Sequence, residues 1–289
     1  MHTETDTSDA FLAAVRTNLN ESLAPYVLYR EMDKDIASLT NGKMLRSRLI
    51  HAVGSAVGTN QQQLISAAVA VEMLHAASLL HDDVIDGGTV RRGTPALWTT
   101  RGPSVAILSG GLLLSLSFAK IAASQPHAVP VLADALRLMC EAEIEQSCIQ
   151  DHSAFSWGDY LRIARGKTGS LFGFSAYCAA GENHATAQAL WEAGNQIGIA
   201  YQMADDLLDL RGDDKTFGKT LGTDAATGKV TAAAFWQKEE MSPQTLLQPS
   251  LDKAREAVSS WMPLQQTLQA FIKNTLQPAI DSYTEPFSQ

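Results

Sequence analysis

Two groups of aspartates in this sequence have the residue types and spacing of metal ligands. The first reads DDVID at residues 82–86 and the second reads DDLLD at residues 205–209. In a helix, the first and last aspartates of such a group lie one turn apart on the same face, and their charges repel each other. A divalent cation would remove this repulsion, and ligands made only of oxygen favour Mg²⁺ over Zn²⁺. The predicted metal ligands are Asp82, Asp83, Asp86, Asp205, Asp206 and Asp209.

The alternative interpretation is that each group is the solvated acidic end of a helix. A single DDxxD group is weak evidence, because aspartate-rich chains produce one by chance. Here there are two, and each ends a predicted helix (61–86 and 184–211) that is apolar on nearly all sides. Such helices belong in the centre of a bundle, and a conflict between burial and charge is typical of a functional site.

Basic residues near the two aspartate groups could hold phosphates, because Mg²⁺ usually joins a few carboxylates to substrate phosphates. Arginine suits bidentate hydrogen bonds with phosphate, and lysine supplies a point charge. Taken singly, each of these residues is more often a surface charge, so their weight comes from their positions relative to the aspartates. The candidates are Lys43, Arg46, Arg91, Arg92, Lys167 (followed by Thr168) and Lys219.

The segments that must position these residues are predicted to be helices. Long stretches have helical periodicity, and runs of β-branched residues are scarce. The expected helices are 8–38, 43–57, 61–86, 104–123, 129–150, 157–181, 184–211 and 227–238, with two more between 243 and 285. Segments 87–102 and 212–226, rich in Gly, Thr, Arg and Lys, are expected to be loops. Without an internal repeat or a break in composition, the chain is predicted to be one all-α domain over 1–289.

The composition restricts the class of protein. The chain has 289 residues, a formal net charge of −9 and 45% hydrophobic residues, which suits a globular protein and argues against a nucleic-acid partner. Its three cysteines form no CxxC pair, and the polar N-terminus does not resemble a signal peptide, so a cytoplasmic location is expected. The apolar run 105–119 is short for a membrane span, and a buried helix is expected there.

The order of the motifs resembles that of the trans-isoprenyl diphosphate synthases (polyprenyl synthetases). LLHDDVID at 79–86 with RRGTP at 91–95 resembles the first aspartate-rich region of that family. YQMADDLLD at 201–209 with GK at 218–219 resembles the second, and GTD at 222–224 and GK at 228–229 continue the match. The resemblance runs from about Gly42 to Thr231.

The resemblance implies an all-α helical bundle of the isoprenoid synthase type around a central cavity, active with Mg²⁺ as a homodimer. The implied reaction joins isopentenyl diphosphate to an allylic diphosphate (dimethylallyl, geranyl or farnesyl) and releases diphosphate. In the family pattern, Arg91, Lys167 and Lys219 match the allylic diphosphate site. Residues that match the isopentenyl diphosphate site are Lys43, Arg46, His75 and Arg92, and Lys229 is a further candidate for substrate binding. Thr168 and Gln202 match polar groups at the reacting centre, while His75 could also be a core histidine.

Three positions depart from the family pattern: Met44 replaces an arginine, Ser47 a proline and Gly111 an aspartate. None of them removes a predicted metal ligand. A class I terpene cyclase also uses aspartates and Mg²⁺, but it would not need cations for a second diphosphate and usually has a different second metal motif. A non-catalytic partner subunit is expected to lose one aspartate group, and both are intact here.

Product length is predicted from the helix that precedes the first aspartate group. Leu74 and Ser78 lie two turns and one turn before Asp82, with Ala77 alongside, so they should face a tunnel that holds the growing chain. Ser78 and Ala77 are small, and the first motif lacks a two-residue insertion seen in many bacterial farnesyl-type enzymes. Products of twenty carbons or more are therefore expected.

Overall fold

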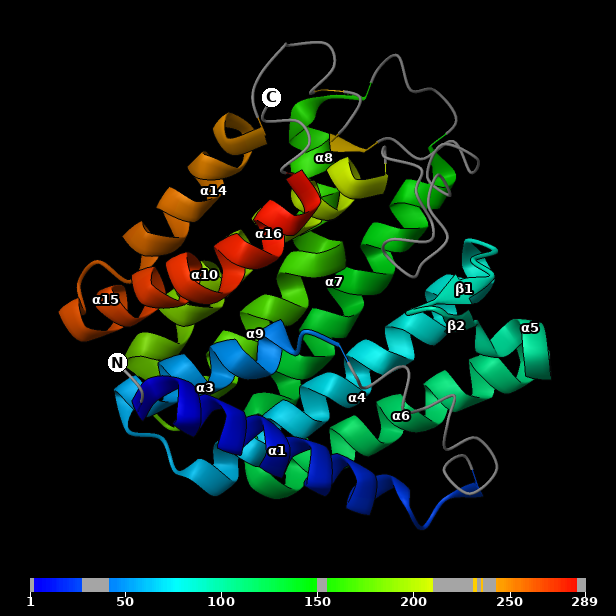
Figure 1. Cartoon of the computed structure of the whole chain (residues 1–289), viewed down its shortest axis with the longest axis horizontal. Coiled ribbons are helices and arrows are strands. Elements are labelled where there is room, and N and C mark those ends of the chain that lie inside the picture. The colour runs from blue at the N-terminus through cyan, green and yellow to red at the C-terminus, as the bar shows by residue number, and fades with distance from the viewer. Residues whose placement is uncertain are drawn as a thin grey trace.

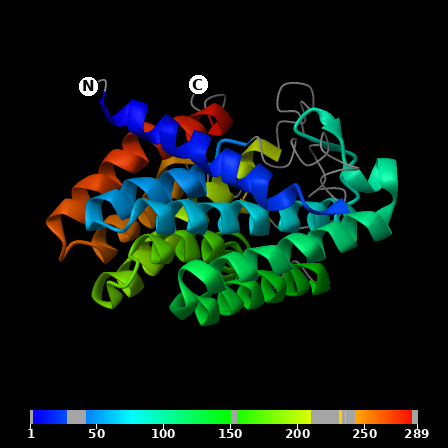
Figure 2. The ribbon, with the colours of Figure 1, turned by 90° about the horizontal axis from the view of Figure 1, so that it is seen from below.

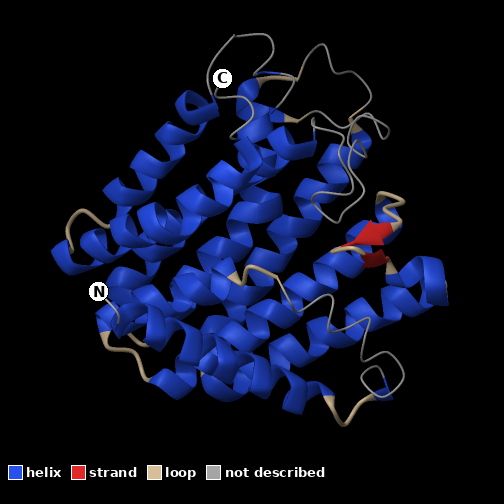
Figure 3. Ribbon diagram, in the orientation of Figure 1, coloured by secondary structure: helices blue, strands red, loops and turns tan. Residues whose placement is uncertain are grey.

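The computed structural model describes residues 3–27, 42–149, 155–209, 231–232, 235 and 243–284. Within these ranges nearly all the regular structure is helical (Figures 1 and 3). The first helices are α1 (Thr3–Leu23), α3 (Leu45–Val57), α4 (Gln61–Ile85), α5 (Leu97–Arg101), α6 (Pro103–Ser124) and α7 (Val129–Cys148). They are followed by α8 (Trp157–Ala164), α9 (Ser170–Ala179), α10 (His184–Asp209), α14 (Pro243–Ala257), α15 (Met262–Phe271) and α16 (Gln277–Thr284).

Shorter elements complete the fold. Strands β1 (Val90–Arg91) and β2 (Thr94–Pro95) form an antiparallel hairpin just after α4. A short 3₁₀ turn, η1 (Pro126–Ala128), precedes α7, and two π-helical turns, η3 (Arg165–Gly169) and η4 (Ile272–Leu276), continue directly from the helices before them.

Helix α4 lies in the middle of the bundle. It packs against α1, α3, α6 and α9, while α10 packs against α9, α14 and α16. Figure 2 shows α1 and α16 on one side of the molecule and α6 and α7 on the opposite side. The buried apolar side chains form one contiguous cluster. Both ends of the chain contribute to it, for example through Phe11 and Ile280. The all-α prediction is confirmed, and the single domain over 1–289 stays a prediction.

The ends of α4 explain its position. The side chain of Asn60 caps its first turn by accepting hydrogen bonds from the backbone N–H groups of Gln62 and Gln63 at 2.9 and 3.4 Å. Its middle is apolar on nearly all sides and buried, and the hydroxyl of Ser117 on α6 donates to the carbonyl of Ala70 at 2.9 Å. The charged last turn emerges from this packing beside the β1–β2 hairpin (Figure 1).

The π-helical turn η3 packs closely against α10. A Cβ atom at Gly198 would lie only 2.6 Å from the Cα of Gly169, so glycine at 198 is required for this approach. Next to this contact, the Thr168 hydroxyl donates to Gln202 Oε1 on α10. Wide π turns of this kind occur often at functional sites.

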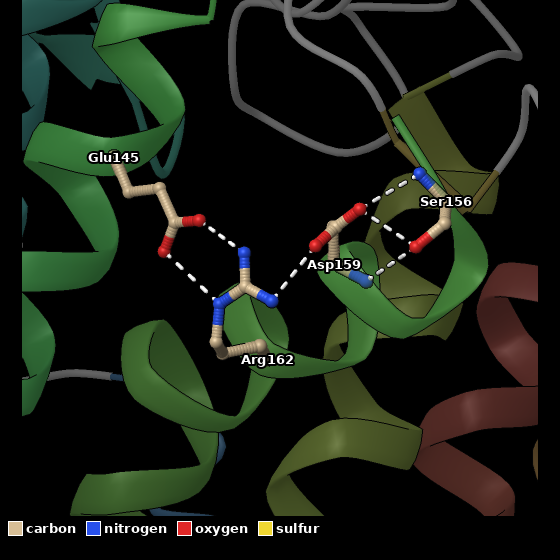
Figure 4. Close-up of polar contacts among 4 residues, drawn as sticks. All are labelled: Glu145, Ser156, Asp159 and Arg162. Carbon is tan, nitrogen blue, oxygen red and sulfur yellow. Dashed lines mark hydrogen bonds and ion pairs between the residues drawn. The ribbon is translucent and has the colours of Figure 1, made fainter. Parts of the chain in front are cut away.

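Polar contacts hold α8 against α7 (Figure 4). Ser156 and Asp159 form a capping box at the start of α8, in which the Ser156 hydroxyl donates to Asp159 Oδ2 at 2.6 Å and accepts from the Asp159 N–H at 3.2 Å. Arg162 donates to Asp159 Oδ1 at 2.8 Å and also pairs with Glu145 on α7. The Ser156–Asp159 contacts thus define the start of α8, and the Arg162–Glu145 pair joins α8 to α7.

Several predicted boundaries differ from the structure. Segment 87–102 was expected to be a loop, but it contains β1, β2 and α5, because its glycines permit the tight turn of a short hairpin. Helix α1 begins five residues before the predicted start at residue 8. The predicted loop 212–226 and nearly all of the predicted helix 227–238 lie outside the described residues.

Helices α4 and α6 are long and apolar enough to cross a membrane, judged by length and composition alone. In α4, 78% of the apolar 18-residue stretch is buried inside the protein, as in the core helix of a globular fold. In α6 only 33% is buried, and Ile107 and Leu108 are 50% and 73% exposed. The prediction of a buried helix at 105–119 is therefore right for one face of α6 and wrong for the other.

Candidate functional site

The two aspartate groups lie on opposite sides of one cavity of about 340 Å³. Helix α4 and the β1–β2 hairpin form one wall, α10 forms the other, and α7 and η3 close the space between them. Thirteen of the predicted site residues line it: Arg46, His75, Ser78, Asp82, Asp83, Asp86, Arg91, Arg92, Lys167, Thr168, Gln202, Asp205 and Asp209. Residues far apart in the sequence are thus collected in one place.

The first aspartate group combines burial with excess negative charge. Burial raises the pKa of Asp82 to about 7, with Glu143 and Asp86 adding to the rise and Lys167 and Arg91 opposing it. Burial likewise raises the pKa of Asp83, although Arg91 donates two hydrogen bonds to it. A carboxylate in such a place favours any ligand that brings positive charge.

Two residues of α7 hold the ammonium group of Lys167 at the cavity. Lys167 Nζ lies 2.5 Å from Glu143 Oε1 and donates to Gln146 Oε1 at 3.0 Å. Burial alone would lower the pKa of Lys167, but the carboxylates of Glu143 and Asp82 outweigh it and keep this pKa above its ordinary value. Lys167 is therefore a fixed, fully charged cation beside the first aspartate group.

The second aspartate group is divided by the packing of α10. Asp205 and Asp209 line the cavity, whereas Asp206 is 5% exposed and is not among the described residues that line it. Its oxygens accept hydrogen bonds from the Tyr160 hydroxyl at 2.8 Å, the Ala232 N–H at 2.9 Å and the Gln202 amide at 2.7 Å. This arrangement does not support the sequence-based assignment of Asp206 as a metal ligand, because its carboxylate is used inside the protein.

The other end of the cavity is rich in buried positive charge. The guanidinium of Arg46 lies 4.5 Å from the centre of the Phe172 ring, and its Nε atom is buried without a hydrogen-bond partner among the described residues. Burial and the charges of Arg46, Arg92 and Arg91 hold the pKa of His75 well below its ordinary value, so His75 is neutral. This end can accept an anion, but the aspartates at the opposite end cannot do so without a cation.

Two departures from the family pattern lie beside Arg46. Met44 is buried and has a left-handed backbone with φ of 49°, which is uncommon for a residue other than glycine. Ser47 is fully buried, and its hydroxyl donates to Glu72 Oε1 on α4 at 2.6 Å. Ser47 thus fixes a buried carboxylate behind Arg46. Gly111 is exposed on α6 and does not line the cavity.

The donors at the aspartate end fit a hard cation. Asp83 Oδ2 and Glu143 Oε2 are buried and have no hydrogen-bond partner in the described part of the chain, so each could accept a cation or its bound water. Within that same part, no three carboxylate, imidazole or thiol groups converge closely enough to hold a metal ion by themselves. Mg²⁺ usually takes only one or two carboxylates together with water and substrate phosphate, so a site completed by substrate suits this arrangement.

Some predicted residues do not line the cavity. Lys43 Nζ lies 3.2 Å from Ser282 Oγ and 3.3 Å from the carbonyl of Ala279 on α16. Leu74 and Ala77 are fully buried in the packing of α4, so only Ser78 of the three predicted chain-length residues faces the cavity. Lys219 and Lys229 lie outside the described residues.

The sequence analysis missed several residues that the structure brings to the site. Glu143 and Tyr201 line the cavity, and Gln146 contacts Lys167, which also lines it. Glu72 and Tyr160 lie one contact farther away, because they bond to Ser47 and Asp206, which do not line the cavity. The spacing of Glu143 and Gln146, three residues apart on one helix, is the only signal that could have paired them. Nothing near them in the sequence marks them as partners of Lys167.

Comparisons with known proteins agree with this geometry. Residues 29–267 match the family described as polyprenyl synthetase. A geranylgeranyl diphosphate synthase of Mycobacterium tuberculosis is 34% identical over 209 residues, which are 69% of this chain and 59% of that protein. A (2E,6E)-farnesyl diphosphate synthase of the same species is 31% identical over 202 residues, 68% of this chain and 56% of that protein. The match thus spans about three fifths of the length of these curated relatives.

A solved structure is similar over a larger share of its length. The crystal structure of a polyprenyl synthase from Caulobacter crescentus, complexed with calcium and isoprenyl diphosphate, has a TM-score of 0.80 and 27% sequence identity to this chain. The alignment covers 92% of this chain and 94% of that one.

Proposed function

This chain belongs to the polyprenyl synthetase family, and we propose that it is a Mg²⁺-dependent trans-prenyltransferase. In the proposed reaction, isopentenyl diphosphate is joined head to tail to an allylic diphosphate, and diphosphate is released. The observation that carries the proposal is one cavity with aspartates and Lys167 at one end and Arg46 and Arg92 at the other. Two differently built ends suit two diphosphates, one bound through a metal and one bound directly by cations.

The aspartate end is suited to the leaving group. When the allylic carbon–oxygen bond breaks, the electron pair leaves with the diphosphate, and negative charge grows on its oxygens. Lys167 would donate to these oxygens from a fixed position, and such preorganised donors stabilise developing charge. Asp82, Asp83, Asp86, Asp205 and Asp209 would hold Mg²⁺, which would neutralise part of the charge on the leaving group.

The opposite end is suited to isopentenyl diphosphate. Arg46 and Arg92 would pair with its phosphates, and neutral His75 could donate one hydrogen bond without adding charge. The double bond of the isopentenyl group would then attack the allylic cation, and a proton would leave the new chain. Leu79, Met139 and Leu171 line the same cavity and would keep water away from the cation. The released diphosphate is the proposed base.

A product of twenty carbons or more remains our proposal. The side chain of Ser78 is small and faces the cavity, so it leaves room for a growing chain. The geranylgeranyl and farnesyl synthases reported above have nearly equal identity to this chain, so identity does not discriminate between these products. The cytoplasmic location expected from the sequence also stays a prediction.

A homodimer is the proposed assembly. The outer face of α6 is apolar, with Ile107 and Leu108 exposed, and Ile144 of the neighbouring α7 is 63% exposed. An apolar face of this kind is typical of a surface that another protein covers. Light scattering at micromolar concentration should give the mass of a dimer, and Leu108→Lys should shift it toward a monomer. A wild-type monomer would contradict the dimer.

Incubation with isopentenyl diphosphate, Mg²⁺ and each allylic primer in turn, followed by dephosphorylation and chromatography, tests the proposed reaction. Linear prenyl alcohols longer than the primer are expected, and none should form when EDTA is present. A cyclic hydrocarbon formed from the primer alone would instead indicate a terpene cyclase. Binding of both substrates without any product would indicate a non-catalytic partner subunit.

A further inference from the structure

A chain of hydrogen bonds runs from the cavity into the core through Asp206. The hydroxyl of Thr168 donates to Gln202 Oε1, and Gln202 Nε2 donates to Asp206 Oδ1 at 2.7 Å. Asp206 Oδ2 in turn accepts from the Tyr160 hydroxyl at 2.8 Å and from the Ala232 N–H at 2.9 Å. This series of hydrogen bonds, here called the relay, links η3, α10, α8 and the segment at residue 232.

The polarity of this relay is determined at its buried end. A carboxylate only accepts hydrogen bonds, so Gln202 must present its NH₂ group to Asp206 and its carbonyl to Thr168. The hydroxyl proton of Thr168 is then directed to Gln202, and the oxygen lone pairs of Thr168 are directed away from it. An asparagine at 206 could not satisfy Gln202, Tyr160 and Ala232 together, because its NH₂ group would face a donor.

We propose that Asp206 and Tyr160 are positioning residues that orient Gln202 and Thr168 in the cavity, and that Asp206 is not a metal ligand. The inference rests on the proposed function, since it concerns the same site. Tyr160 is 3% exposed and stacks on Trp157, with ring centroids 5.0 Å apart and planes 16° apart. Its hydroxyl is therefore held rigidly and can fix Asp206 from outside the cavity.

Tyr160→Phe is the mildest test, because it keeps the ring and removes only the hydroxyl. We expect kcat to fall roughly tenfold, the effect of about one hydrogen bond. In a Gln202→Leu background the relay is already broken, so Tyr160→Phe should have little further effect on kcat. An equal fall in both backgrounds would mean that Tyr160 acts independently of Gln202 and would overturn the proposal.

The dependence on Mg²⁺ separates positioning from metal binding. Asp206→Asn should lower kcat but leave the half-saturating Mg²⁺ concentration within about twofold of the wild-type value, whereas Asp205→Asn, at the cavity, should raise that concentration more than tenfold. A rise in Asp206→Asn as large as that in Asp205→Asn would make Asp206 a ligand and reject the inference.

If the wild-type protein makes no prenyl product, the proposed function fails, but the relay can still be tested without substrate. The free energies of unfolding of Tyr160→Phe, Asp206→Asn and the double variant are measured by urea denaturation. Coupling through the relay predicts that the double variant loses less than the sum of the two single losses. Additive losses would show that the two side chains do not act together.

Discussion

The guanidinium of Arg91 reaches back to Asp83, and its Nε and Nη2 atoms donate to the same carboxylate oxygen at 3.0 and 2.5 Å. The pair joins strand β1 to the last turn of α4. The side chain of Asp83 is only 2% exposed, and that of Arg91 is 23% exposed. Removal of the arginine would leave a buried carboxylate without its main partner.

We therefore expect Arg91→Ala to lower the free energy of unfolding by about 2–4 kcal/mol in urea denaturation without metal. The double variant Arg91→Ala/Asp83→Asn should recover much of this stability. It should recover little activity, because the predicted contact of Arg91 with the allylic diphosphate is still missing. Arg137→Ala is the matched control, since Arg137 pairs with Glu141 on the exposed surface and should cost less than about 1 kcal/mol. Equal losses in Arg91→Ala and Arg137→Ala would contradict the larger cost expected for breaking the buried pair of Arg91 and Asp83.

Both aspartate groups are expected to be necessary for turnover. Asp82→Ala or Asp209→Ala should lower kcat by at least about two orders of magnitude, because each removes a ligand that holds the metal on the leaving group. Asp134→Ala, at an exposed position on α7, should leave kcat unchanged. Near-normal kcat in either cavity variant at saturating Mg²⁺ would refute the role of that aspartate.

Arg92 should act mainly on isopentenyl diphosphate. Arg92→Ala is expected to raise the KM for this substrate about tenfold or more, with a smaller effect on the allylic substrate, because it removes a charged contact to phosphate. Lys219→Ala, outside the described residues, is predicted to affect chiefly the allylic substrate. The same defect toward both substrates in both variants would refute this division.

Gly42 gives an independent test of the position of Arg92. A Cβ atom at residue 42 would lie 2.5 Å from Arg92 Nη2, so Gly42→Ala should displace the guanidinium. The flexible end of an arginine moves easily, and the cost in stability should therefore be small. Steady-state kinetics should show a higher KM for isopentenyl diphosphate and an almost unchanged melting temperature. An unchanged KM would indicate that Arg92 does not need its present position.

Ser78 is the position at which product length should respond. Ser78→Phe places an aromatic ring in the cavity, and the main product should shift toward fifteen carbons without loss of turnover. Ala77→Phe is a contrasting variant, because Ala77 is fully buried and the added ring should destabilise the core by about 1–3 kcal/mol. Chromatography of the products checks the shift. A wild-type enzyme that stops at fifteen carbons with excess isopentenyl diphosphate would contradict the length proposal alone.

The cap of α8 should make stability depend on pH in the acid range. Hydrogen bonds from the side chain and backbone of Ser156, and then from Arg162, lower the pKa of Asp159 from its ordinary value of 3.8 to about 2. A depressed pKa means that the contribution of Asp159 is fully present above about pH 4 and is lost as the pH falls toward 2. Asp159→Asn should therefore be less stable than wild type in urea at pH 7, and the difference should shrink below pH 4. A difference that is constant from pH 7 to pH 3 would contradict this account.

The helical class and most of the cavity could be predicted because they depend on periodicity and on motifs local in the sequence. The DDxxD groups identified the ends of α4 and α10, and these do face each other across the cavity. The pattern alone could not show which aspartate faces inward. Asp206 is turned toward Tyr160 and Ala232, and only the packing of α8 and the segment at 232 determines this.

Contacts between distant helices explain the other differences. Leu74 and Ala77 have the correct spacing from Asp82, but neighbouring helices surround α4 so closely that both are in the core. Glu143 and Gln146 gain their role only because α7 lies beside η3. Lys43 has the family spacing, yet its ammonium group contacts Ala279 and Ser282 of α16, more than two hundred residues later. Such relationships require the tertiary structure.

The π-helical turn η3 also has a consequence for how this sequence can change. Each residue of an α-helix turns the chain by about 100°, so an inserted or deleted residue rotates everything that follows it. A π turn is the exception, because it holds one residue more than an α-helical turn. Removal of one residue from Arg165–Gly169 would restore a regular α-helical turn and leave α9 in register, with Phe172 and Phe174 in the core, but it would change the position of Lys167 beside α7. A change in the length of this turn would therefore alter the site while leaving the packing of the neighbouring helices in place.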